Sequence, residues 1–423
     1  MRILIATSHR NVVGGVENYL RVAIPGLLDR AHEVGLLYEF PFDANRETID
    51  PAKAPVPSWC AGQRGCSGVL ESLAAWKPDI VYSNGIEAGE LENALLERYP
   101  VVFYAHNYYG TCVSAQKCHA WPEARPCGRE FGSGCLALYY PRRCGGLNPV
   151  TMVKQFRRQS ECNARLPRFE RILVASRHMQ REFLKHGVNP DRLHLVPLPN
   201  TGVPDPNPPS TRVPGGNLLF AGRLTELKGA SLLIQALPAA ARKLARPLRL
   251  VIAGDGPERN RLEGLARRLG VDVDFAGWVD HDERVKLMRA ADLLVVPSVW
   301  PEPFGLVGIE AGCLGLPSVA FAVGGIPDWL IPGESGESAP GDTPCADSLA
   351  PAIDRALADV EHYQNLRRGA WETARQFTLA DHLAKLEPLL CSGDTRSVIN
   401  PATLRAESTS AVQAPHATAS AAV

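Results

Sequence analysis

Charged side chains stand at two points of the sequence where an apolar run ends and an amphipathic run begins. At the first point, Arg223 and Lys228 lie five residues apart in NLLFAGRLTELKG. Arginine presents a planar fork of donors and lysine a mobile point charge. Together they suit a diphosphate and could stabilise the negative charge of a departing one without a metal. Two solvated surface cations are the alternative interpretation.

At the second point, two glutamates flank a turn in PEPFGLVGIEAG, Glu302 before it and Glu310 eight residues later. The turn consists of Pro303, Phe304, Gly305 and Leu306. The glycine permits close backbone approach, and the amides of Gly305 and Leu306 at a helix N-terminus can point at phosphate oxygens. We expect Glu302 to face a sugar and Glu310 to accept hydrogen bonds from ribose hydroxyls. A salt-bridged structural pair is the alternative.

The first half of the chain has glycines and a histidine at comparable positions. Gly14 and Gly15 precede an amphipathic run, but the G-x-G-x-x-G spacing of dinucleotide-binding proteins is absent. By themselves these glycines predict a tight turn. His106 ends the apolar run VVFYAH, and its predicted place at a strand end favours contact with a substrate. A satisfied hydrogen-bonding residue is the alternative.

The elements that must position these residues follow from the hydrophobic pattern. Short apolar runs alternate with amphipathic runs, which predicts an α/β protein with parallel strands and crossover helices. We expect two Rossmann-like, doubly wound domains facing each other across a cleft. They span residues 1–196, with a Cys- and Arg-rich insertion at 107–165, and residues 217–391. The Pro- and Gly-rich segment 197–216 is the predicted linker, and 392–423 is predicted to be disordered.

Length and charge narrow the function classes. The 423 residues suit two domains, and 45 basic against 45 acidic residues give no bias toward nucleic acid as a partner. The apolar stretch at the N-terminus is too short for a signal peptide, and no window reaches the roughly 20 apolar residues of a spanning helix. We therefore expect a cytoplasmic protein.

The ordered series FAGRLTELKG, LVIAGDGPERNRLEGLARRLGV, VDFAGWV and ADLLVVPSVWPEPFGLVGIEAG resembles the donor domain of glycosyltransferase family four, the glycosyl transferases group 1, over residues 217–375. The resemblance implies the GT-B fold and transfer of a sugar from a nucleotide diphosphate, with retention of configuration and without a metal or other cofactor. It implies that Arg223 and Lys228 hold the diphosphate, and that Glu302 contacts the transferred sugar while Glu310 contacts the ribose.

Further residues take roles from the same resemblance. Those placed against the nucleobase are Gly277, Trp278 and Val279. Those that would line the same crevice are Gly254, Asp255 and Gly256, although a helix N-cap turn also explains them. Gly324 and Gly325 fall on a loop beside the pocket, where a structural turn is equally plausible.

In the first half, GGVE is similar to the GGxE element of the family. This implies that Gly14 and Gly15 approach the donor phosphate or the acceptor, while Glu17 caps the helix. His106 matches the histidine of the family's His-Asp pair, but Asn107 replaces the aspartate, which leaves the orientation of the histidine open. Retention implies attack on the face that the diphosphate leaves, with the diphosphate taking the acceptor proton.

Five cysteines crowd into the insertion: Cys112, Cys118, Cys127, Cys135 and Cys144. Their spacing lacks the short C-x2-4-C knuckle of zinc sites, so reduced, partly buried thiols are our preferred interpretation, and a metal site that includes His119 is the alternative. The insertion is similar to those of some bacterial family members in surface polysaccharide assembly. This implies cell-surface polysaccharide or glycolipid assembly, with a sugar, a lipid-linked molecule or a small molecule as the acceptor.

Basic residues outnumber acidic ones between Arg142 and Lys185, with Tyr140, Phe156 and Phe169 interleaved. This pattern suits peripheral contact with a membrane or a lipid diphosphate acceptor, and an Arg-rich solvated helix is the alternative. Three rival functions are a catalytically silent nucleotide-sugar-binding protein, an NAD-dependent dehydrogenase and an epimerase of GT-B form. The glycine spacing argues against the second, and the Glu-x7-Glu pattern against the third. The sequence leaves the sugar, the base and the acceptor open.

Overall fold

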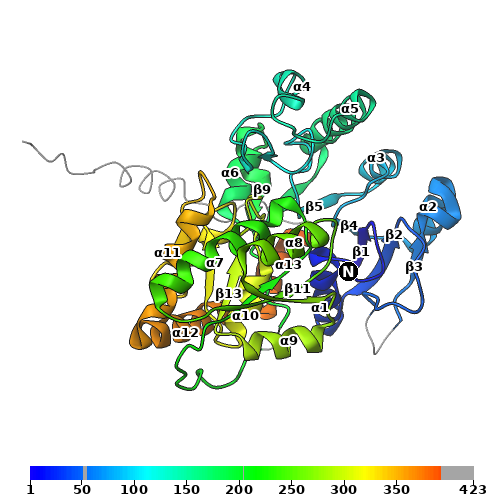
Figure 1. The fold of residues 1–423 in the computed structure, drawn as a ribbon. Coiled ribbons are helices and arrows are strands. Elements are labelled where there is room, and N and C mark those ends of the chain that lie inside the picture. The colour runs from blue at the N-terminus through cyan, green and yellow to red at the C-terminus, as the bar shows by residue number, and fades with distance from the viewer. Residues whose placement is uncertain (51–54, 203, 392–423) are drawn as a thin grey trace, which may run out of the picture. The chain divides into compact units, whose positions relative to one another are not determined.

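The first half of the chain folds around a seven-stranded parallel sheet (Figure 1). The computed structural model describes residues 1–50, 55–202 and 204–391. The strands, in sheet order, are β3 (Ser58–Cys60), β2 (Glu33–Tyr38), β1 (Arg2–Thr7), β4 (Ile80–Ser83), β5 (Val101–Ala105), β8 (Arg171–Val174) and β9 (Leu193–Leu195). Most of their residues are buried apolar side chains, as expected for strands with helices on both faces.

The helices of this half are α1 (Gly15–Asp29), α2 (Ala61–Trp76), α3 (Gly89–Arg98) and α6 (Arg177–Lys185), with the 3-10 turns η1 (Leu166–Arg168) and η2 (Pro190–Arg192). The Cys-rich insertion adds an antiparallel pair, β6 (Cys118–His119) and β7 (Arg125–Pro126), and the helices α4 (Gly134–Tyr139) and α5 (Pro149–Arg165). Two signals start helix α5. The side chain of its N-cap residue Asn148 accepts a hydrogen bond of 2.9 Å from the amide of Val150, and a proline, which needs no partner for its nitrogen, occupies the first helical position.

The second half contains a six-stranded parallel sheet. Its strands, in sheet order, are β12 (Asp272–Gly277), β11 (Arg249–Ala253), β10 (Asn217–Ala221), β13 (Leu293–Val296), β14 (Ser318–Phe321) and β15 (Gly336–Ala339). The helical elements are η3 (Glu226–Lys228), α7 (Ala230–Leu244), α8 (Arg259–Leu269), α9 (His281–Ala290), α10 (Leu306–Cys313), η4 (Ile326–Asp328), α11 (Ala346–Ala358), α12 (Val360–Ala374) and α13 (Leu379–Leu390). The predicted pair of Rossmann-like sheets is confirmed.

Each sheet reverses its strand order once. In the first sheet the reversal lies between β1 and β4, and in the second between β10 and β13. Ligands of open parallel sheets bind beyond the carboxyl ends of the strands at such a switch point. A ligand site is therefore expected at the loops that follow these four strands.

The last helix returns to the first sheet. Although α13 follows the second sheet in the sequence, it packs against α1. Glu387 on α13 forms ion pairs with Arg30 and His32, the latter at 2.9 Å, and the hydroxyl of Tyr19 lies 2.9 Å from Nε2 of His382. Residues 1–390 consequently form one compact unit. The predicted disordered tail, 392–423, lies outside the described residues.

Among the described residues, no helix has both the length and the apolar composition that crossing a membrane requires.

Candidate active site

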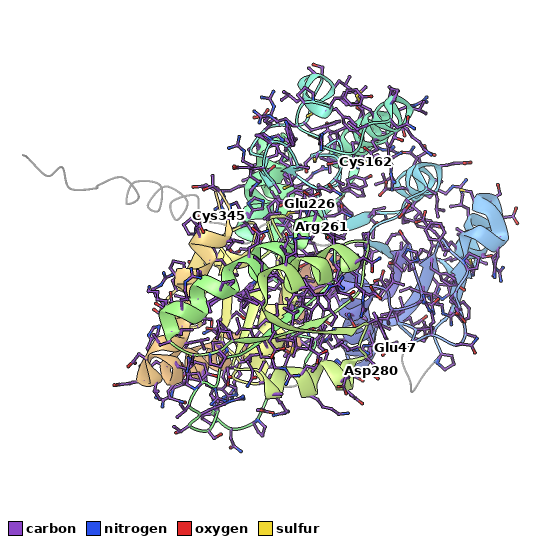
Figure 2. All side chains as sticks on the ribbon, in the orientation of Figure 1. Glu47, Cys162, Glu226, Arg261, Asp280 and Cys345 are labelled. Atoms are coloured by element: carbon purple, nitrogen blue, oxygen red, sulfur yellow. The ribbon has the colours of Figure 1, made fainter. Side chains whose placement is uncertain are left out.

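Lys228 and Glu302 meet at the switch point of the second sheet. The lysine ends η3, which begins at Glu226, labelled in Figure 2. Its Nζ donates to Oε1 of Glu302 at 2.6 Å and lies 4.9 Å from the ring centre of Trp300. The hydroxyl of Ser298, which follows β13, donates to the same oxygen at 2.7 Å. Because Glu302 is only 6% exposed, its carboxylate requires these partners.

Arg223 follows β10 on the same edge, and its side chain is exposed. Within the described ranges no carboxylate lies within ion-pair distance of its guanidinium. Lys228 is thus engaged by a carboxylate while Arg223 remains open to solvent. The predicted pair of cations does lie on one loop, between β10 and α7, although the two side chains differ in environment.

Glycines allow this loop to touch the loop after β11. A Cβ atom at Gly254 would lie 1.9 Å from the carbonyl oxygen of Gly222, and one at Gly256 would lie 2.4 Å from that of Leu224. Asp255 is exposed, and its carboxylate accepts a hydrogen bond of 2.7 Å from the amide of Gly256. The two glycines therefore serve close backbone packing beside the site.

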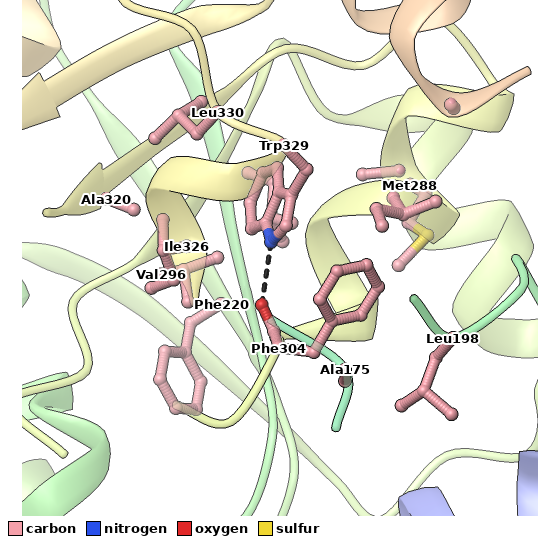
Figure 3. Close-up of a cluster of buried hydrophobic side chains, with 14 of the residues drawn as sticks. Ala175, Leu198, Phe220, Met288, Val296, Phe304, Ala320, Ile326, Trp329 and Leu330 are labelled. Carbon is pink, nitrogen blue, oxygen red and sulfur yellow. Dashed lines mark hydrogen bonds between the residues drawn. The ribbon is translucent and has the colours of Figure 1, made fainter. Parts of the chain in front are cut away.

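The turn after Glu302 divides into a buried part and an accessible part. Pro303 and Phe304, which we expected to contact the donor, are buried. Phe304 is 2% exposed, and its carbonyl accepts a hydrogen bond of 2.7 Å from the indole of Trp329, drawn in Figure 3. Apolar burial and a satisfied carbonyl make these residues a support for the turn, and their contact with the donor stays a prediction.

Gly305 and Leu306 form the accessible part. Gly305 is the N-cap of α10 with φ of 91°, a left-handed conformation that favours glycine, and Leu306 is the first helical residue. Both are partly exposed. The first amides of a helix lack partners within the helix, so this end of α10 presents donors suited to an anion, as the sequence predicts.

Gly324 and Gly325 hold the backbone of Glu302. A Cβ atom at Gly324 would lie 2.2 Å from the carbonyl oxygen of Glu302, and the amide of Gly325 donates to that oxygen at 2.7 Å. Of the two interpretations left open for these glycines, the contacts support a structural one, in which their lack of side chains brings the loop after β14 against the glutamate.

Glu310 has partners of its own on α10. Its Oε1 accepts a hydrogen bond of 2.5 Å from the hydroxyl of Thr201 in the linker, and its Oε2 lies 3.5 Å from the guanidinium of Arg284 on α9. Each glutamate thus forms an ion pair, Glu302 with Lys228 and Glu310 with Arg284, as the alternative interpretation of a salt-bridged structural pair expects. The contacts of Glu302 with a sugar and of Glu310 with a ribose stay predictions. After β12, Trp278 is 78% exposed and follows Gly277, while Val279 is partly buried.

His106 lies at the end of β5 and is held by a residue that the sequence did not reveal. Its Nε2 lies 2.9 Å from Oδ1 of Asn84, and the side-chain nitrogen Nδ2 of Asn84 donates to the backbone carbonyl of Tyr82 at 3.2 Å. That second bond orients the asparagine, so Nε2 of His106 carries the proton and Nδ1 is an acceptor. Burial, with a smaller contribution from His382, lowers the pKa of His106 to about 3.

Asn84 thus supplies the orientation that Asn107, which is exposed, does not. A buried network surrounds the histidine. The ring of Tyr104 stacks on His106 at 4.5 Å, and the hydroxyl of Tyr19 lies 2.7 Å from that of Tyr82. A signal for Asn84 existed in the sequence, because it directly follows the strand-like run DIVYS, as His106 follows VVFYA.

Gly14 and Gly15 begin α1 beside the same network. Gly14 is the N-cap, and Oε2 of Glu17 lies 3.5 Å from the position of a Cβ atom at Gly14. Burial raises the pKa of Glu17 despite hydrogen bonds from backbone amides that lower it. Nothing lies within 4 Å of a Cβ atom at Gly15, so that side of the turn is open.

Residues of the first half also fasten the loop that carries Glu302. The hydroxyl of Tyr108 donates to the carbonyl of Pro301 at 2.5 Å, and the hydroxyl of Ser176 donates to that of Pro303 at 2.6 Å. Neither residue could be recognised from the sequence, because their partners lie more than 100 positions away. The loop after β13 is thus held by residues that follow β5 and β8.

The five cysteines of the insertion form no disulfide with one another. Two of them, Cys112 and Cys118, are buried, and burial raises the pKa of the Cys118 thiol to about 12. In the part of the chain that the structure describes, no group of three or more His, Cys, Asp or Glu side chains is arranged to hold a metal ion. Whether the thiols stay reduced remains a prediction.

Two family models match the chain, "Glycosyltransferase Family 4" over residues 13–199 and "Glycosyl transferases group 1" over residues 213–373. The chain belongs to the glycosyltransferases of the GT-B fold. One model covers each Rossmann-like half, and the boundary between the models falls in the linker.

Similar proteins agree with this assignment. An uncharacterized glycosyltransferase of Methanocaldococcus jannaschii is 42% identical over 170 residues, which are 40% of this chain and 42% of that protein. The glycogen synthase of Mycobacterium tuberculosis is 36% identical over 179 residues, which are 40% of this chain and 42% of that protein. These alignments span about two fifths of the relatives' length. The structure of Anabaena HepE in complex with UDP-glucose has a TM-score of 0.64 at 21% identity, with coverage of 92% of this chain and 99% of that chain.

Proposed function

We propose that the protein is a retaining, metal-independent glycosyltransferase that moves a sugar from a nucleotide diphosphate to a hydroxyl group of an acceptor. The observation that carries the proposal is the arrangement after β10 and β13. There, Lys228 pairs with the buried Glu302, while Arg223 and the first amides of α10 lie on the loops that follow the same two strands. Cations and helix amides at one switch point suit a leaving diphosphate.

In the proposed complex, Arg223 and the amides of Gly305 and Leu306 bind phosphate oxygens. Lys228 exchanges part of its contact with Glu302 for the diphosphate, which frees the carboxylate to accept a hydrogen bond from a sugar hydroxyl. Glu310 receives the ribose hydroxyls, and the exposed ring of Trp278 with Val279 lies against the base. Anabaena HepE binds UDP-glucose, which supports a nucleotide sugar as the class of donor.

His106 contacts the sugar or the acceptor as a neutral hydrogen-bonding group. Because its pKa is lowered to about 3, the imidazole is uncharged near neutral pH and Nδ1 can accept a hydrogen bond from a hydroxyl group. The acceptor attacks from the face that the diphosphate leaves, and the diphosphate takes the acceptor proton. No side-chain nucleophile is required in this mechanism.

A donor screen followed by transfer assays tests the proposal. Thermal shift with UDP-, GDP- and ADP-sugars should reveal a stabilising donor, since saturating ligand adds a few kcal/mol to stability. The protein should then hydrolyse or transfer the bound sugar, with the anomeric configuration retained by NMR and with activity undiminished by EDTA. Donor binding without any turnover would favour the silent binding protein instead. No binding of any nucleotide sugar would refute both functions.

The cellular setting is part of the proposal. We infer a cytoplasmic enzyme of cell-surface polysaccharide or glycolipid assembly that contacts the inner face of the membrane peripherally and does not bind nucleic acid. The glycogen synthase relative supports a carbohydrate acceptor, and the basic insertion supports a membrane contact.

A further inference from the structure

Two stretches of the insertion expose apolar and cationic side chains, one at Trp121 and Arg143 and the other from Leu147 to Lys154. We call them together the insertion tip and define it by Trp121, Arg143, Leu147, Val150, Val153 and Lys154. Figure 1 shows α4 and α5, the two helices of the insertion, at the top of the view beyond the strands of the first sheet. The tip shares no residue with the candidate active site.

The apolar residues of the tip are unusually accessible. Leu147 is 69% exposed, Val150 73%, Val153 58% and Trp121 50%. Val150 and Val153 are three residues apart on the first turns of α5, so they share one face of the helix. Leu147 directly precedes that helix. Of the aromatic residues named from the sequence, Phe169 is fully buried, Phe156 packs on Phe131 at 5.2 Å and Tyr140 packs on Tyr139 at 5.4 Å, so none is as exposed as these side chains.

Cations border these apolar side chains. The guanidinium of Arg143 lies 4.7 Å from the ring centre of Trp121, and Lys154 is exposed on the same face of α5 as Val150 and Val153. Between positions 119 and 160 the chain has seven arginines and lysines against two glutamates, although the whole chain is balanced. The local excess is therefore a property of the insertion, to which Arg143 and Lys154 belong.

We propose that the insertion tip docks on a bilayer that contains anionic lipids. Leucine, valine and tryptophan side chains enter the boundary between head groups and acyl chains, and Arg143 and Lys154 meet lipid phosphates. Nucleic acid fits less well, because aliphatic side chains at the centre of the surface offer nothing to a phosphate backbone. The docking holds the first half of the enzyme near a lipid-linked acceptor, and this last step alone depends on the proposed function.

Vesicle flotation of the full chain tests the docking. Phosphatidylcholine vesicles with phosphatidylglycerol should carry the protein upward, those without it should carry much less, and added salt should weaken the binding. Val150→Ser/Val153→Ser and Arg143→Gln/Lys154→Gln should each lower the partition coefficient by roughly tenfold. Matched controls are Val213→Ser, an equally exposed valine, and Arg267→Gln/Arg268→Gln on α8, which should bind as the parent does.

The docking is overturned if the parent does not float with anionic vesicles, or if the tip variants float as well as the parent. Thermal shift with the nucleotide-sugar donor on the same variants keeps the two questions separate. A tip variant that binds donor normally but not vesicles supports the docking, whereas loss of donor response in the parent would count only against the transferase.

Discussion

The two switch points have the same topology but opposite electrostatic character. The edge of the second sheet carries formal charges, with Lys228 and Glu302 joined at 2.6 Å and Arg223 exposed nearby. The edge of the first sheet carries His106, which burial keeps uncharged near neutral pH because its pKa is lowered to about 3. The second edge therefore suits the charged diphosphate, and the first suits neutral hydroxyl groups.

Removing the charge from the second edge should have the largest effect. Lys228→Ala deletes the cation proposed for the diphosphate, so kcat should fall by about 10²- to 10³-fold. Glu302→Gln should also lose turnover while the fold persists, as circular dichroism would verify. Lys286→Ala removes an exposed lysine that pairs with Glu283 on α9 and is the control. Near-normal rates in both site variants would contradict the assigned roles.

Moving the glutamate without touching its charge should have the next effect. Gly324→Ala places a Cβ atom 2.2 Å from the carbonyl oxygen of Glu302, so the loop must shift and kcat should fall on the order of tenfold. Gly333→Ala is the matched control, because its φ is also positive, at 79°, but its Cβ atom meets nothing within 4 Å. Both variants should lose about 1 kcal/mol of stability from backbone strain. Equal activity in the two variants would mean that loop position is unimportant.

Acid should act mainly on the neutral groups beside the first edge. Burial lowers the pKa of His382 from 6.5 to about 4, so between these values the unfolded chain binds one more proton than the folded chain. The contribution of His382 to the free energy of unfolding is therefore fully present above pH 6.5. As the pH falls from 6.5 toward 4, this contribution decreases by about 1.4 kcal/mol per pH unit. Urea unfolding of His382→Gln across that range should show a slope shallower by this amount, and an unchanged slope would contradict the assignment.

The smallest effect is expected for the link between the edges. Ser176→Ala removes the hydrogen bond to the carbonyl of Pro303 and the N-cap bond of 3.2 Å to the amide of Met179. Urea unfolding should show that Ser176→Ala lowers the free energy of unfolding by about 1 to 2 kcal/mol. Ser160→Ala, whose hydroxyl bonds only within α5, should cost less. If both variants cost the same, the link adds no stability of its own.

The fold class and most of the site on the second sheet could be read from local patterns. Apolar runs of strand length alternate with amphipathic runs, and this alternation alone predicts parallel strands and crossover helices. The stretches around Arg223, Lys228, Gly305 and Glu310 can be recognised in the sequence, because a glycine, a charged residue and the end of a predicted strand occur there within about a dozen residues. Such signals are local in the chain, and no tertiary contact is needed to recognise them.

Contacts between distant residues could not be read in this way. That Lys228 pairs with Glu302, 74 positions away, follows from the adjacency of β10 and β13. The partner of His106 proved to be Asn84 because β4 lies beside β5. The sequence pattern named Phe169 for the membrane contact although it is buried, and only packing reveals that Leu147, Val150 and Val153 remain exposed.

The sequence by itself determined the periodicity of the elements and the residue types placed at strand ends, because both depend on neighbours along the chain. The tertiary structure decided which charges are paired, which histidine stays neutral and where α13 packs. Those properties depend on burial and on strand order, and a parallel sheet brings together residues that its sequence keeps far apart.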